Sequence, residues 1–413
     1  MNILTFSKER LNYYDWGIAM NEVQKSKFPL TDHPMFLVGF RPFFILAIIS
    51  GIILPLLWVL MFSGKLPVSL KGINILQWHV HEMFFGFGWA ILGGFLLTAS
   101  KNWVKIRGMH GGWLGLAAAM WLLERVGVWF YGYLPSWLNI LVINAFILYV
   151  SAYVIRSLVV YRKNDSFKDN YFFVIVLLLF IISKNLIFTS SYYTHGWLMA
   201  LGLFRMAFVL MFERTLTQFM KNTFGVSLLR NPILDYSIKV LVLASAFVGF
   251  FPNNVSAIIL CLAGLLLAVR FLLWHPIKGF SNFGIGMSYL GLLGLTVHFF
   301  LEALRMKQEL PVVGALSVHV FTFICMGVVI PAMIIRIAQG HTGRKLLFTR
   351  LDRIALSSMI VGAFFRLIMP QIQPQAYMTW LALAGIGWSL CFALIGYRLI
   401  PFMLQPRIDG KEH

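Results

Sequence analysis

The chain of 413 residues is too apolar to be a soluble protein, because 59% of its residues are hydrophobic and only 12% are charged. Its net charge of +19 does not indicate nucleic-acid binding, because the basic residues lie in short segments between apolar runs and face anionic lipid there. Cys261, Cys325 and Cys391 stand alone within apolar runs, which argues against a disulfide framework. We therefore predict an all-α polytopic membrane protein whose partner is the lipid bilayer.

Twelve apolar runs are candidate membrane spans. About 20 residues cross a bilayer as a helix, and the shortest of the twelve runs have fewer. They cover residues 42–62, 76–99, 112–130, 137–160, 171–188, 197–212, 238–251, 255–274, 285–304, 312–335, 354–369 and 377–400. We expect them to form one transmembrane domain, residues 42–400, between a cytoplasmic N-terminal segment, residues 1–41, and a cytoplasmic tail, residues 401–413.

The positions of the basic residues predict the orientation of these spans. Of the 34 Lys and Arg residues, 26 lie on the side of the two termini, 5 lie on the opposite side and the remaining three fall inside spans. Cytoplasmic loops are enriched in Lys and Arg. Both termini are therefore predicted to be cytoplasmic.

The second span begins with three titratable side chains, His79, His81 and Glu82. Ionisable groups in a membrane helix are costly unless they have partners, so they are functional candidates. Because successive side chains on a helix turn by about 100°, His79 and Glu82 share one face and His81 points nearly the opposite way. The two histidines either serve two sites or lie on an unwound first turn.

Small residues leave one side of the second span nearly bare, at Gly86, Gly88, Gly93 and Gly94. Such a surface suits the close approach of a neighbouring helix, and it equally suits a flat macrocycle. Both explanations stay open at this point.

Two more histidines, His298 and His319, lie in spans on the predicted outer side. Neutral imidazole is the commonest metal ligand and a usual axial ligand of haem iron. Glu302 follows His298 by one helical turn and is expected to orient it by a hydrogen bond.

Three arginines lie inside spans, with Arg125 and Arg366 toward the outer ends and Arg205 deeper. A guanidinium could bind haem propionates bidentately. Pairing with Glu124, Glu302 or backbone carbonyls, or contact with lipid headgroups, is the interpretation that we favour.

The inner side carries several polar motif residues, namely Arg41, Asn102, Arg214, Arg336, His341 and Arg344. Each is explained as an interfacial anchor, and a site for phosphate or a lipid headgroup is the sharper alternative. Gly340 is expected to end the helix that begins before Arg336.

Four short blocks taken together resemble the NnrS family. They are Val38-Gly39-Phe40-Arg41-Pro42-Phe43-Phe44, Trp78-His79-Val80-His81-Glu82-Met83, Gly94-Phe95-Leu96-Leu97-Thr98-Ala99 with Asn102-Trp103, and Arg336 followed by Gly340-His341-Thr342-Gly343-Arg344. His319 also lies where the family has a histidine seventeen residues before the equivalent of Arg336. The resemblance implies a bacterial inner-membrane protein of twelve helices that contains haem and copper and acts in denitrification and protection from nitric oxide.

The chain departs from the family pattern at two places. Phe212-Glu213-Arg214 stands where the family usually has Gly-Gly-Arg, and Gly286 stands where a Leu-His-x-Gly-Tyr pattern has its histidine. If that histidine binds a metal in relatives, this chain lacks one cofactor, such as the copper, or recruits His298 instead.

Our leading hypothesis is an NnrS-like haem protein, with copper as a second cofactor, that acts in nitric oxide or nitrosative stress tolerance and meets nitric oxide or iron-nitrosyl species. His79, His81 and His319 are the expected ligands, with Glu82 as orienting acceptor or proton carrier and Arg125 near the cofactor. Whether the protein is an enzyme is left open. The alternatives are a proton-coupled transporter without a metal and a purely structural assembly factor.

Overall fold

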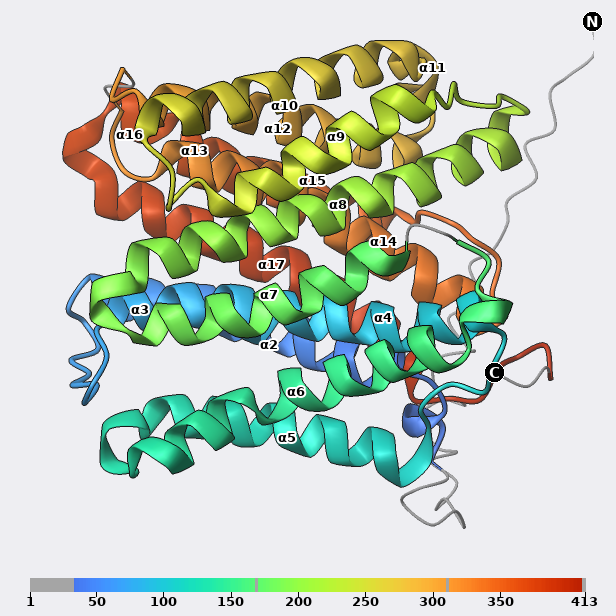
Figure 1. Cartoon of the computed structure of the whole chain (residues 1–413), viewed down its shortest axis with the longest axis horizontal. Helices are drawn as coiled ribbons and strands as arrows, with labels where there is room; N and C mark the ends of the chain where they lie inside the picture. Colours follow the sequence, from blue (N-terminus) through green and yellow to red (C-terminus); the bar gives the residue numbers. More distant parts are fainter. Residues whose placement is uncertain (1–32, 168–169, 310–311, 411–413) are drawn as a thin grey trace, which may run out of the picture.

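The structure is a computed structural model that describes residues 33–167, 170–309 and 312–410. Its elements are helices that lie side by side in one bundle, with most long axes roughly parallel (Figure 1). No strand occurs within these three ranges. The predicted all-α class is therefore confirmed for the part of the chain that the structure describes.

Each of the twelve predicted spans overlaps a helix or a run of consecutive helices, although the seventh, residues 238–251, extends beyond the end of its helix. In chain order these are α2 (Phe40–Phe62), α3, η3 and α4 (Ile75–His81, Glu82–Gly88 and Trp89–Val104), α5 (Gly111–Trp129), α6 (Ser136–Val160), α7 (Tyr171–Phe188), α8 (Tyr193–Phe224), α9 (Pro232–Ala244), α10 (Asn253–Leu273), α12 (Phe283–Met306), α13, η9 and α14 (Leu316–His319, Val320–Gly327 and Val328–His341), α15 (Arg350–Leu367) and α17 (Tyr377–Met403). Two short helices, α11 (Pro276–Phe280) and α16 (Met369–Ile372), lie between them.

Nine helical segments among the described residues are long and apolar enough to cross a membrane. Helices α5, α7 and α9 are not among the nine, although α7 contains a shorter apolar stretch, Phe172–Phe188. The chain therefore has the helices of a multi-pass membrane protein, and twelve crossings stay a prediction.

The two ends of the described chain meet at one end of the bundle. Arg41, in the first turn of α2, donates from Nη1 to the backbone oxygens of Met403 and Gln405, at 3.0 and 2.6 Å. Figure 1 shows the start of α2 and the end of α17 at this same end. Residues 1–32 and 411–413 lie outside the described residues, and the placement of both termini in the cytoplasm stays a prediction.

Close contact between α2 and α4 depends on glycine. A Cβ atom on Gly94 would lie 2.8 Å from Cβ of Phe43, which is closer than carbon atoms approach without a clash. Gly88 and Gly93 are similarly covered, by the rings of Phe204 and Phe146. Helix packing, the first of the two explanations for the bare side of this span, accounts for these glycines.

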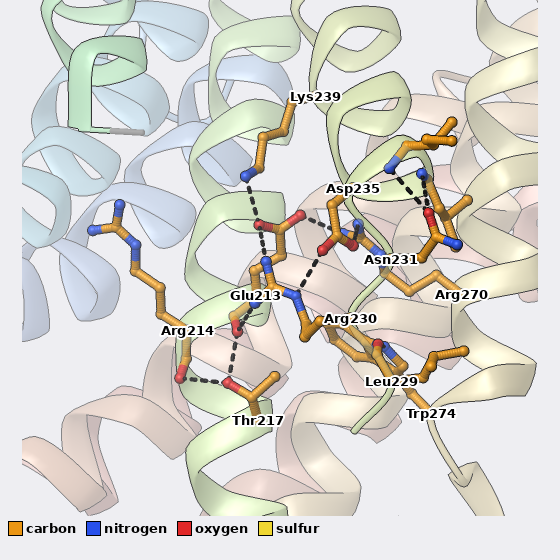
Figure 2. Close-up of polar contacts among 12 residues, drawn as sticks. Glu213, Arg214, Thr217, Leu229, Arg230, Asn231, Asp235, Lys239, Arg270 and Trp274 are labelled. Carbon is orange, nitrogen blue, oxygen red and sulfur yellow. Dashed lines mark hydrogen bonds and ion pairs between the residues drawn. The ribbon is translucent and has the colours of Figure 1, made fainter. Parts of the chain in front are cut away.

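A buried ion cluster ties α8, α9 and α10 together near the same end (Figure 2). Glu213 accepts from Arg270 at 2.7 Å and from Lys239 at 2.9 Å, and Asp235 accepts from Arg270 at 2.6 Å and from Arg230 at 2.7 Å. Buried charges are tolerated when they are paired in this way. Glu213, which departs from the family pattern, is thus the centre of a structural network.

The end of α14 differs from expectation. The helix continues through Gly340 to His341, and the backbone turns at Gly343, whose φ is +80°. A positive φ of this size favours glycine because other residues have a Cβ atom that clashes. Gly343, not Gly340, is therefore the glycine that the chain needs to leave this helix.

Candidate functional site

His79 and His319, 240 positions apart in the sequence, line one cavity of about 350 Å³. Ligand pockets in proteins commonly span about 300–1,000 Å³. The cavity lies between α2, α3, η3, α8, α13, η9, α15 and α17, and its wall is dominated by aromatic rings: Trp58, Phe62, Phe84, Phe87, Tyr193, Trp197, Phe323, Tyr377 and Trp388. The two histidines therefore bring nitrogen atoms to an otherwise largely apolar space.

The ring of His79 is held by stacking. It lies against the indole of Trp58, with ring centroids 3.9 Å apart and an angle of 21° between the planes. Its Nδ1 atom is buried and has no hydrogen-bond partner among the described residues. A buried polar nitrogen without a partner is costly, and Nδ1 of His79 is one of several such atoms among the described residues.

The ring of His319 is held by a hydrogen bond. Its Nδ1 lies 2.7 Å from the backbone oxygen of Ala315, one helical turn earlier. A carbonyl oxygen can only accept, so Nδ1 carries the hydrogen and the lone pair is on Nε2. Nδ1–H bonded to a backbone carbonyl is the arrangement that orients metal-binding histidines.

Arg366 brings a positive charge to the cavity next to His319. Its Nη2 atom lies 3.4 Å from Nε2 of His319, and the guanidinium lies 5.7 Å from the ring centre of Tyr377. Arg366 is one of the arginines that the sequence placed toward the outer end of a span. Of these, it is the one that lines the cavity.

Both histidines precede a π-helix. His79 lies in α3, which leads into η3, and His319 ends α13 and is followed by η9. The capping box between Asn74 and Gln77 fixes where α3 begins. π-Helices are rare and occur often at functional sites, so two of them bordering one cavity mark it independently of the histidines.

His81 lies elsewhere, in a buried cluster of charged groups. Its Nδ1 is 3.0 Å from Glu82 Oε1 and its Nε2 is 3.5 Å from Glu124 Oε1. Glu124 also pairs with Lys184 and with Arg125, and Arg125 lies 3.2 Å from Glu82. His79 thus lies at the cavity and His81 in the charged cluster. Two separate locations were the first of the two possibilities that helix geometry left open.

This placement corrects the expected grouping. His81, Glu82 and Arg125 were expected beside the cofactor with His79 and His319, yet none of the three lines the cavity. The physical reason is that Glu82 and Glu124 must be compensated inside the bundle, and Arg125 and Lys184 do so. For Arg125, pairing with a carboxylate was the interpretation that we favoured.

His298 also lies outside this cavity. Its Nδ1 donates to the backbone oxygen of Ser317 at 2.5 Å, and its Nε2 accepts from Arg205 Nε at 2.9 Å. Both ring nitrogens are therefore engaged by the protein. The expected bond from Glu302 is not formed, because Glu302 instead pairs with Arg305 at 2.7 Å and accepts from Ser317.

The NnrS protein family model matches residues 34–407 of the chain. The chain belongs to the NnrS family. No curated protein matches the sequence. Membership of the NnrS family fits a membrane protein of the nitric oxide response.

In this NnrS-family chain, the motif residues that were predicted to lie on the inner side contact segments that are distant in the sequence. Arg344 donates to the side chain of Gln405 at 2.9 Å, and the ring of His341 lies 5.4 Å from that of Phe40. Arg336 lies 3.6 Å from the ring centre of Phe219. Together with the hydrogen bonds of Arg41, the contacts of Arg344 and His341 connect the start of α2, the end of α14 and the segment after α17. The contact of Arg336 connects α14 to α8.

The two other residues of this group, Arg214 and Asn102, have different surroundings. Arg214 donates to Asn170 at 2.8 Å and lies over the rings of Trp103 and Phe167, at 4.8 and 4.5 Å. Asn102 is exposed. The contacts of Arg214 agree with the interpretation as an interfacial anchor. For Asn102, no side-chain hydrogen bond is found within the described part of the chain that would indicate its role.

Two features of the cavity escaped the sequence analysis. Trp58 supports His79 by stacking, and Met83 and Met326 contribute thioethers to the wall. All three lie in long apolar runs, where a functional aromatic or methionine cannot be distinguished from a packing residue. Trp58 was not found because nothing in the sequence shows that the first span faces the second.

Proposed function

We propose that this NnrS-family protein binds haem in the cavity of His79 and His319 and acts in the response to nitric oxide. The observation that carries the proposal is the meeting of these two imidazoles at one aromatic cavity. Flat aromatic walls suit a macrocycle, and His79 and His319 would be the residues that hold its iron.

The polar atoms of the cavity fit that cofactor. His319 has its lone pair on Nε2, and His79 has a buried Nδ1 without a partner among the described residues. If Nε2 of His319 binds iron, its contact with Arg366 is given up, and the guanidinium becomes available to a carboxylate such as a haem propionate.

Copper fits less well. Within the described ranges, no group of three or more His, Cys, Asp or Glu side chains comes together as a metal site. Gly286, which replaces the histidine of the family pattern, lies in α12 and packs against Phe280. The proposal for this cavity is therefore haem, and copper is left out of it.

Bound haem would supply an iron centre that takes nitric oxide. The chain's own part is to hold the cofactor, to keep water away with aromatic side chains and to place one positive charge beside it. Nitric oxide is small, neutral and soluble in lipid, so a cavity inside the bundle needs no aqueous channel to receive it.

Purification of the protein in detergent tests the proposal. We expect a visible Soret band and haem bound to the native chain, with strong loss in His79→Ala and His319→Ala. His110→Ala is the matched control, because His110 is half-buried in an inner loop and bonds the backbone oxygen of Gly108. Haem content that is equal in all four proteins contradicts the proposal, and a colourless native protein favours the transporter.

A further inference from the structure

A second cavity in the bundle has an apolar lining. Its volume is about 70 Å³, and it lies between α2, η3, α4, α7, α8 and α14. Phe44, Phe173, Phe208 and Val329 are among its wall residues. The lining side chains are all hydrocarbon or thioether, so no side chain there offers water a hydrogen bond.

The composition of this cavity decides what can occupy it. Water enters a cavity only where it finds about two to four polar partners, whereas apolar cavities stay dry and take xenon or small apolar molecules. The share of liquid volume of one water molecule is about 30 Å³, and an apolar cavity of about 150 Å³ holds benzene. A space of about 70 Å³ therefore suits a molecule of about the size of a diatomic gas.

The two cavities share a wall. Phe84 lines the first cavity, Phe204 lines the second, and their rings stack with centroids 5.3 Å apart. Gly88, in the same π-helix as Phe84, lines the second cavity, and a Cβ atom there would lie 2.7 Å from Phe204. The stacked rings of Phe84 and Phe204, together with Gly88, therefore form part of the wall between the histidine cavity and the apolar one.

We propose that the second cavity is a binding site for one small, neutral, apolar molecule of diatomic size. Its assignment to nitric oxide rests on the proposed function, whereas its ability to bind an apolar gas does not. Because such gases partition into lipid, the cavity would hold a molecule taken from the bilayer next to the histidine site.

Xenon is the probe that tests the proposal, and the methionines of the chain are the reporters. Met211 and Met333 line the second cavity, Met83 and Met326 line the first, and Met220 is fully buried but lines neither. In the full-length protein in lipid nanodiscs, labelled with ¹³C at the methionine methyl groups, we expect xenon to shift the Met211 and Met333 signals saturably. The Met220 signal should stay unchanged.

Filling the cavity should abolish this response. Ala207 lines the second cavity, so Ala207→Leu places a larger side chain in it and should reduce the xenon-induced shifts at least about fivefold. Ala207→Val is the smaller change and should give an intermediate reduction if the leucine variant does not fold. Ile258→Phe is the control, because Ile258 is exposed on α10 and contacts neither cavity.

The outcomes separate this inference from the proposed function. Xenon shifts that are confined to Met83 and Met326, or that survive both Ala207 variants unchanged, overturn the inference even if the protein contains haem. Shifts at Met211 and Met333 that disappear on filling support it even if the protein is purified without haem.

Discussion

The imidazole of His298 donates from Nδ1 to the backbone oxygen of Ser317, two residues before His319. The hydroxyl of Ser317 in turn donates to Glu302 at 2.6 Å. Helix α13, which carries His319, is thereby attached to α12 by two hydrogen bonds. One buried histidine thus positions the short helix that brings another to the cavity.

His298→Leu is expected to destabilise the protein without changing the ligands of the proposed haem. The substitution leaves the Ser317 oxygen and Arg205 Nε without their partner, and each buried group costs about 1–3 kcal/mol. We expect a lower unfolding temperature and a lower haem content, with an unchanged position of the Soret band. Ser288→Ala on the same helix is the control, because the Ser288 hydroxyl has no partner among the described residues. A shifted Soret band in His298→Leu would instead make His298 a ligand.

Glu124→Gln is expected to be among the most damaging single changes in the bundle. Glu124 is fully buried and pairs with Lys184 and Arg125, so its loss leaves a buried ammonium uncompensated, at a cost of about 3–5 kcal/mol. The double variant with Lys184→Met should lose less than the sum of the two single changes.

The control for this change is a more exposed pair. Asp409 pairs with Arg407 at 2.6 Å, and Asp409→Asn should cost less than about 1 kcal/mol. The free energy of unfolding in detergent is the measurement. Similar losses in Glu124→Gln and Asp409→Asn would show that the buried cluster is not needed for stability.

Two glycines of one family motif should respond oppositely to alanine. Gly343 has a φ of +80°, and a Cβ atom there would lie 2.7 Å from Cγ of Asp409, so Gly343→Ala should destabilise by more than about 1 kcal/mol. Gly340 lies within α14 with open space around it, so Gly340→Ala should stabilise by about 0.5–1 kcal/mol. Thermal unfolding of the purified variants measures both effects, and the opposite order would place the helix end at Gly340 after all.

The predicted orientation can be measured with single cysteines. Ser69 lies in the exposed loop between α2 and α3, and Ser281 lies in the exposed loop between α11 and α12 at the other end of the bundle. A membrane-impermeant thiol reagent should label Ser69→Cys in intact cells and Ser281→Cys only after the membrane is opened. The unsubstituted chain, with Cys261, Cys325 and Cys391, gives the background. Labelling in the reverse order would invert the topology.

The helical architecture could be predicted because apolar runs and basic loops are properties of the local sequence. Every predicted span overlaps a helix, although the shortest, residues 238–251, overlaps α9 only in its first half. The unusual winding at η3 and η9 could not be predicted, because a π-helix has the same apolar composition as its flanking α-helices.

The candidate site could be predicted only in part. His79 and His319 were recognised because imidazole inside a membrane span is conspicuous in any sequence. The sequence could not predict which arginine lines the cavity with the two histidines, since Arg125 and Arg366 have similar positions in their spans. They differ in the side chains that surround them in the folded protein. Arg125 pairs with Glu82 and Glu124, and its pairing with Glu82 depends on how η3 packs against α5.

The two π-helices have a consequence for changes in chain length. A π-turn closes from residue i to residue i+5, so each of these segments contains more residues per turn than an α-helix. Deleting one residue from Glu82–Gly88 or Val320–Gly327 would allow the segment to relax to α-helix while the helices on either side keep their faces. Deletions at these two places would therefore reshape the cavity and leave the rest of the bundle intact.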